Sequence, residues 1–181
     1  MSIKFGNVSI TTTHNLSISH CLKGVKNKHS NIHGHNYKLE VTFSKSRIAP
    51  VSNVYDMLND SIIPIHKHGV VLSKDNIEKL LNENIISKYN FSLLVWDKGT
   101  DNYEFNDFLH DLTLTERENA HIILVPWQPT VVNICIEFYK ILSIALSEMA
   151  CKNIDFDRVE LQRIRLYEDD YTFAEYSESL A

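Results

Sequence analysis

Apolar and polar residues alternate along two segments near the start of the chain. In residues 3–20, Leu16 and Ile18 share their parity with His20. In residues 33–43, the odd positions from His33 to Phe43 are histidine, tyrosine or apolar residues, and the even positions after residue 36 are polar. Side chains alternate between the two faces of a strand, so this period predicts two strands that each bury one face. The polar, lysine-rich loop between them favours an antiparallel pair.

The middle of the chain follows helical rather than strand periods. Residues 56–63 could form a short helix that Pro64 ends, and a better one begins at Asp75. The longest predicted helix ends near Ala150 and follows Thr130, whose hydroxyl suits an N-cap. Its apolar positions recur at helical spacing and are Ile134, Phe138, Ile141, Ala145 and Met149.

Shorter strand-like runs complete the pattern. Residues 91–105 predict a strand or a hairpin, and residues 122–125 predict a short strand. Near the C-terminus, a strand over 158–167, an acidic turn at 168–170 and a strand over 171–176 are expected. The order of strands, helices and strands predicts an α+β protein with an antiparallel sheet. Few prolines and glycines interrupt the chain, so we expect one domain over residues 1–181.

Composition narrows the class of protein. The chain has 181 residues, of which 44% are hydrophobic and 23% charged, and a net charge of −5. These values exclude an intrinsically disordered chain and give no general attraction to nucleic acid or to an anionic membrane. No apolar run reaches the roughly 18 residues of a membrane helix, and the three cysteines show no disulfide spacing. A cytoplasmic protein without nucleic-acid or membrane partners is therefore expected.

Three histidines fall where they could meet. His33 and His35 lie two residues apart in one predicted strand, so their side chains share a face. His20 ends the preceding strand on its apolar face, and pairing of the strands brings all three imidazoles together. Three neutral imidazoles suit a tetrahedral Zn²⁺ site with one open position, as catalytic zinc sites require. The alternatives are a chance pair of loop histidines and a cupin-like site with Glu40, whose parity places it on the other face.

The segment SISHCLKGVKNKHSNIHGHNYKLEV, residues 17–41, resembles the first motif of the 6-pyruvoyl-tetrahydropterin synthase and 6-carboxytetrahydropterin synthase family. The match rests on an upstream histidine followed by H-G-H-N-Y. Further resemblances follow in order: V-Y-D at 54–56, V-P-W-Q-P-T at 125–130, R-L-Y-E at 165–168 and Tyr176. They cover nearly the whole chain, with an insertion expected around residues 75–120.

The resemblance implies a fold, an assembly and a reaction. The family's tunnelling fold is a small antiparallel sheet with two main helices on one face, and its subunits assemble as trimers or hexamers with sites at subunit interfaces. Its members act on 7,8-dihydroneopterin triphosphate with Zn²⁺, which here would be held by His20, His33 and His35. Lys23, Lys26 and Lys28 could meet the triphosphate, or could simply be solvated. The product, whether a pyruvoyl, carboxy or hydroxymethyl pterin, stays open, and with it the biopterin, queuosine or folate pathway.

Other functional residues follow from the same resemblance. Glu168 would anchor the pterin ring, whose 2-amino and ring N–H groups match a carboxylate in a bidentate pair. Thr130 would add a hydroxyl contact to the ring or act only as a helix cap. His29 occupies the place of the family's catalytic cysteine, and imidazole can act as a base near neutral pH. The supporting catalytic position would fall to His68 or to the Asp97–Lys98 region.

Three functions remain open at this point. The first is a zinc-dependent pterin synthase or lyase, and the second is a catalytically altered or inactive protein that keeps the zinc and pteridine sites. The third is a structural zinc protein that does not contact a pterin.

Overall fold

The two N-terminal strands form a long antiparallel pair. In the computed structural model, which describes residues 8–26, 28–45, 71–97, 121–156 and 158–178, β1 spans Val8–His20 and β2 spans His33–Lys45. They pair along their whole length, and His20 lies opposite His33 at the end nearest the connecting loop. That loop contains a 3-10 turn, η1, over Lys28–Ser30. The sequence therefore predicted both strands and their antiparallel pairing.

Four further strands extend this pair into a six-stranded sheet with the order β4-β3-β1-β2-β5-β6. β5 (Val159–Tyr167) and β6 (Phe173–Tyr176) add antiparallel strands on the β2 side, as expected. β3 (Ser92–Trp96) and β4 (Ile122–Val125) pair in parallel on the β1 side. The sheet was predicted to be antiparallel, and it is mixed, because the pairs β1–β3 and β3–β4 are parallel. β3 follows a helical segment rather than a tight turn, and such crossover connections permit parallel pairing.

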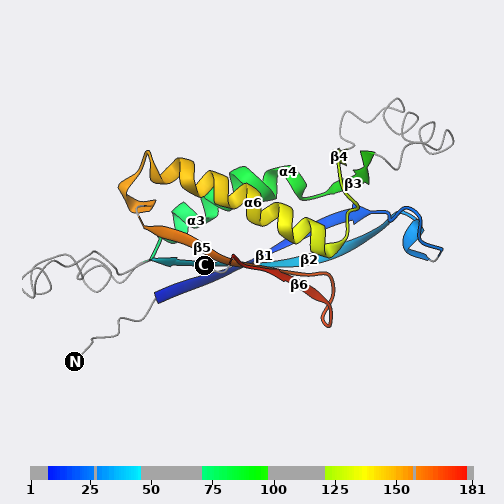
Figure 1. The fold of residues 1–181 in the computed structure, drawn as a ribbon, viewed down its shortest axis with the longest axis horizontal. Helices are drawn as coiled ribbons and strands as arrows, with labels where there is room; N and C mark the ends of the chain where they lie inside the picture. Colours follow the sequence, from blue (N-terminus) through cyan, green and yellow to red (C-terminus); the bar gives the residue numbers. More distant parts are fainter. Residues whose placement is uncertain (1–7, 27, 46–70, 98–120, 157, 179–181) are drawn as a thin grey trace, which may run out of the picture.

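Helices cover one face of the sheet (Figure 1). The first is α3 (Lys74–Leu81), which continues through a π-helical turn, η2 (Asn82–Ile86), into α4 (Ser87–Tyr89). The second is α6 (Val131–Ala150), which begins after its N-cap Thr130 and ends where the sequence pattern predicted. A 3-10 turn, η4 (Ile154–Phe156), leads from α6 into β5. Within the described residues, no helix is both long and apolar enough to cross a membrane.

The core lies between this helical layer and the sheet. Its α6 residues follow the predicted stripe, but the buried face is shifted toward Leu142 and Leu146, while Ile141 and Met149 are only half-buried. The shift arises because α6 contacts β5 and β6 and also η2. The fully buried residues include side chains from every layer: Leu39, Val41, Phe43, Ile77, Leu80, Leu81, Ile85, Ile134, Phe138 and Ile164.

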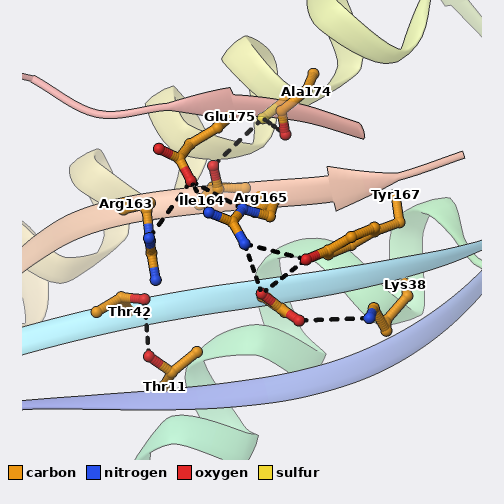
Figure 2. Close-up of polar contacts among 11 residues, drawn as sticks. Thr11, Lys38, Thr42, Arg163, Ile164, Arg165, Tyr167, Ala174 and Glu175 are labelled. Atoms are coloured by element: carbon orange, nitrogen blue, oxygen red, sulfur yellow. Dashed lines mark hydrogen bonds and ion pairs between the residues drawn. The ribbon is translucent and has the colours of Figure 1, made fainter. Parts of the chain in front are cut away.

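The face of the sheet away from the helices is polar (Figure 2). Arg165 donates to the Glu175 carboxylate at 2.6 and 2.8 Å, and one of its other N–H groups donates to the Tyr167 hydroxyl at 3.1 Å. Glu40 belongs to this face as well, where its carboxylate lies 3.5 Å from the Lys38 ammonium. Glu40 is therefore directed away from the histidine-bearing face, which excludes the cupin-like alternative.

Some expectations fall outside the described residues. These are the helix over 56–63, the V-Y-D match, His68, Lys98 and residues 98–105 of the predicted strand or hairpin. The insertion around 75–120 stays a prediction for the same reason, because residues 98–120 are not described. Residues 74–96 form α3, η2, α4 and β3, and their apolar side chains enter the core.

Thr130 offers a first test of the fold. Its hydroxyl accepts a hydrogen bond from the Asn133 backbone N–H at 3.3 Å and so caps α6. Replacing Thr130 with alanine should lower the free energy of unfolding by about 1 kcal/mol, and Thr130→Asn should restore most of it. Urea unfolding measures both. If both variants bind a pterin as tightly as the unchanged protein does, Thr130 acts only as a cap. Weaker binding by both variants would indicate that the Thr130 hydroxyl contacts the ring.

Candidate metal and pterin site

Three imidazoles meet at one end of the β1–β2 pair. His20 lies opposite His33, and His35 follows two residues later on the same face of β2. Their ring centroids are 4.5 Å (His20–His33), 5.2 Å (His20–His35) and 5.1 Å (His33–His35) apart. One ring nitrogen from each residue lies within 4.8 Å of the other two. The strand register alone therefore produces the cluster that the sequence predicted.

Backbone carbonyls set the orientation of two of the rings. His20 Nδ1 donates to the Pro129 carbonyl, and His33 Nδ1 donates to the Asn31 carbonyl at 2.9 Å. A neutral imidazole that donates through Nδ1 carries a lone pair on Nε2. Ligating histidines are typically held by such hydrogen bonds from their other nitrogen.

The Nε2 atoms of all three histidines are buried and have no hydrogen-bond partner among the described residues. Burial lowers the pKa of His20, an effect that the Pro129 carbonyl partly opposes and the neighbouring histidines reinforce. The neutral form is the one that binds metal. Buried imidazole nitrogens without partners, directed at a common point, fit a metal ion with three protein ligands.

Glu168 lies beside this cluster. It follows β5 directly, and its backbone N–H donates to the Thr172 carbonyl at 2.9 Å, which closes the turn into β6. Its Oε1 atom lies 3.6 Å from His35 Nε2 and 3.8 Å from His20 Nε2. The Glu168 side chain is 21% exposed, so solvent can reach it. The site thus combines three nitrogen donors with one carboxylate that solvent can reach.

Sequence reasoning missed the role of Tyr37. Its side chain is fully buried, and its hydroxyl donates to Glu168 Oε1 at 3.5 Å. Its ring packs edge-on against the His35 ring at a centroid distance of 5.6 Å. Burial, followed by the nearby Glu168 charge, raises the pKa of this phenol, so the hydroxyl stays a donor. The signal was available, because Tyr37 shares the parity of His33 and His35.

A second missed contact joins the site to the start of α6. The Gln128 side chain donates to the Lys23 carbonyl at 2.7 Å and accepts from the Lys23 backbone N–H at 3.1 Å. Asn133 Nδ2 in turn donates to the Gln128 carbonyl at 2.9 Å. These bonds attach the loop after His20 to the turn that supplies the Pro129 carbonyl. Residues so far apart in sequence gave no pattern from which the contact could be predicted.

The residues proposed for chemistry differ in how closely they approach the cluster. His29, in η1, is exposed, and its ring centroid lies 5.4 Å from that of His33. Thr130 is half-buried next to Pro129, which contacts His20, and caps α6. Asp97 is described and is not a member of the histidine group. The structure therefore brings together His20, His33, His35 and Glu168, with His29 adjacent.

None of the three cysteines is suited to act as a base at this site. Cys21 follows His20 but is buried, and burial raises the pKa of its thiol. Burial likewise raises the pKa of Cys135 to about 11, and its thiol is directed at the Ile164 carbonyl at 3.6 Å. Cys151 is exposed at the C-cap of α6, the end opposite to Thr130. A thiolate is the reactive form of cysteine, and the two buried thiols are held protonated.

Comparisons with known proteins bear on the fold and on the family of the chain. Comparison with curated proteins finds no match. Among solved structures, the chain is similar to 6-pyruvoyl tetrahydropterin synthase from Caenorhabditis elegans, at 15% identity and a TM-score of 0.55, with 98% of this chain and 100% of that chain covered. The enzyme from Plasmodium vivax matches at 10% identity and a TM-score of 0.59, covering 97% and 100%. At such identities the likeness establishes the fold.

An uncharacterized protein from Wolinella succinogenes shares the fold to the same degree, at 11% identity and a TM-score of 0.59, with 97% of this chain and 100% of that chain covered. A family model provides the stronger result. The model described as 6-pyruvoyl tetrahydropterin synthase matches residues 9–179, which include the three histidines and Glu168. The chain therefore belongs to the 6-pyruvoyl tetrahydropterin synthase family.

Proposed function

We propose that this protein is a zinc-dependent pterin synthase or lyase that acts on 7,8-dihydroneopterin triphosphate. The observation that carries the proposal is the convergence of three buried imidazole nitrogens, which have no hydrogen-bond partner in the described part of the chain, next to a partly exposed glutamate. Family membership implies a small-molecule pterin substrate and a lyase-type reaction. The nature of the metal, the exact substrate and a cytoplasmic homo-oligomer, trimeric or hexameric, are parts of the proposal.

Each residue of the site has a distinct task in this proposal. His20, His33 and His35 would hold Zn²⁺, which when bound supplies a Lewis acid that makes the C–H next to a side-chain hydroxyl more acidic. Glu168 would accept hydrogen bonds from the 2-amino and ring N–H groups of the pterin. Lys23 and Lys26 lie in the loop between β1 and η1 and could meet the triphosphate. The base then has to remove one proton before triphosphate is lost or the side chain is cleaved.

We propose His29 as that base. The cysteine of the family motif is replaced here, and the chain's own cysteines are buried with raised pKa values or lie far along α6. His29 is exposed next to His33, so its ring can reach a substrate held at the cluster. The supporting position remains assigned to His68, or alternatively to the Asp97–Lys98 region.

Replacing His29 with alanine should lower kcat by roughly 10²–10⁴-fold, the usual contribution of a general base, with little change in zinc affinity. Steady-state kinetics and a zinc titration of the same preparation measure both effects. His121, which lies outside the cluster just before β4, provides a control through His121→Ala. Full activity of the His29 variant would show that another group removes the proton.

The second candidate function is a zinc- and pteridine-binding protein without catalytic activity. The observation that favours it is the replacement of the catalytic cysteine by a residue whose exposed side chain lies in a loop. Incubation of zinc-loaded protein with 7,8-dihydroneopterin triphosphate, followed by chromatographic product analysis, separates the two functions. Zinc-dependent release of triphosphate supports the enzyme, and unchanged substrate together with measurable pterin binding supports the binding protein.

A further inference from the structure

The Glu168 carboxylate lies closer to the histidine nitrogens than a role as a pterin anchor alone requires. Its Oε1 atom lies 3.6 and 3.8 Å from two Nε2 atoms, which is too long for hydrogen bonds. Two ligand atoms of one tetrahedral zinc ion, each about 2.0–2.2 Å from the metal, lie roughly 3.3–3.6 Å apart. The spacing between the carboxylate and two of the imidazoles, those of His20 and His35, is therefore close to that of ligands sharing one cation, while Glu168 lies outside the 4.8 Å group that the three histidines form.

The electrostatics of the site also favour a cation shared by the imidazoles and the carboxylate. His20 donates through Nδ1, so its Nε2 presents a lone pair toward the carboxylate. A lone pair and a carboxylate oxygen repel each other unless a proton or a cation lies between them. The Tyr37 hydroxyl donates to Oε1 at 3.5 Å and so uses only one of the two lone pairs of that oxygen. A cation bound by the three imidazole nitrogens would accept electron pairs from these nitrogens and from the Glu168 carboxylate together.

We propose that Glu168 is a fourth, displaceable ligand of the metal when no pterin is bound. This inference rests on the proposed metal site and extends it. A pterin would withdraw the carboxylate by pairing with it through its 2-amino and ring N–H groups. Ring binding thereby opens the coordination position that the side chain of a complete substrate requires. Glu168 thus couples recognition of the ring to access to the metal.

Zinc affinity tests the ligand role directly. Competition with a chromophoric chelator should show that Glu168→Gln and Glu168→Ala bind Zn²⁺ at least 10–100-fold more weakly than the unchanged protein, since even outer-shell changes have that effect. Asp170→Asn is the matched control, because it removes one negative charge from the same turn at an exposed side chain. It should change zinc affinity by less than about 3-fold, as expected for a screened surface charge.

The proposal predicts that pterin and zinc weaken each other's binding, and unsubstituted pterin is the probe that measures this effect. Unsubstituted pterin lacks the side-chain hydroxyls through which a complete substrate would reach the metal, and its 2-amino and ring N–H groups compete with the metal for Glu168. Its affinity should be lower for the zinc-loaded protein than for the zinc-free protein, and zinc affinity should fall by the same factor when pterin is present. Co²⁺-substituted protein should report the change as a shift of its visible absorption on addition of pterin.

The possible outcomes separate this inference from the proposed function. If the Glu168 variants bind zinc as tightly as Asp170→Asn, and pterin binds equally with and without zinc, Glu168 is not a ligand, while the enzyme proposal is unaffected. If alanine at His20 leaves zinc binding unchanged, the metal site itself is wrong and both proposals fail. Weakened zinc binding in the Glu168 variants, with unchanged circular dichroism and negative coupling to pterin, supports the displaceable ligand.

Discussion

Replacing His20 with alanine is expected to weaken Zn²⁺ binding by roughly 10²–10³-fold. Zinc sites with four protein ligands bind with apparent free energies of about 10–16 kcal/mol, or roughly 2.5–4 kcal/mol for each ligand. Each ~1.4 kcal/mol changes the dissociation constant tenfold. His20 is the most buried of the three histidines, at 1% exposure, so water cannot easily take its place at the metal. Activity should be lost together with the metal.

His14→Ala is the appropriate control for this experiment. His14 lies on the same strand and the same face as His20, is half-buried, and does not belong to the cluster. Isothermal titration of the two variants with Zn²⁺, under identical buffer conditions, measures the difference. An equal loss of affinity in both variants would mean that zinc responds to general damage of β1 rather than to the removal of a ligand.

The second large effect concerns the hydrophobic core. Phe138 is fully buried on α6 and packs edge-on against Tyr89, with ring centroids 4.9 Å apart. Replacing Phe138 with alanine should lower the free energy of unfolding by about 3–5 kcal/mol, because the change removes buried apolar area and leaves a cavity. Since domains of this size are stabilised by only about 5–15 kcal/mol, this variant should be close to unfolding at elevated temperature.

Urea unfolding followed by circular dichroism measures this loss. Ile144 lies on the same helix but is 62% exposed, so Ile144→Ala should change the free energy of unfolding by about 0.5 kcal/mol or less. A similar effect of both substitutions would contradict the assignment of the α6 face that packs in the core. Zinc binding by folded Phe138→Ala should remain intact, because β1 and β2 supply the three ligands.

The sequence was most informative where side chains alternate in a strand. The period of two in residues 33–43 placed His33 and His35 on one face, and the parity of Leu16 and Ile18 placed His20 on the matching face of β1. Antiparallel pairing of the two strands then brings the three histidine side chains together, and the structure has that cluster. The cap at Thr130 and the end of α6 at Ala150 were also predictable, since both follow from local rules.

Contacts between distant segments were not predictable in this way. Nothing local to Gln128 indicates that its side chain holds the backbone of Lys23, or that the Pro129 carbonyl accepts from His20. The parallel pairing of β3 with β1 likewise depends on the path of the intervening helices. The position of Glu168 next to His35 results from pairing between β5 and β2, which no periodicity in a single strand reports.

Crystals of the zinc-loaded protein, measured on both sides of the zinc absorption edge, give the most direct test of the central claim. We predict one anomalous peak per chain, at about 2.0–2.1 Å from the Nε2 atoms of His20, His33 and His35. A peak at another place, or no peak in protein that has been saturated with Zn²⁺, would contradict the assignment of these three histidines as the metal site.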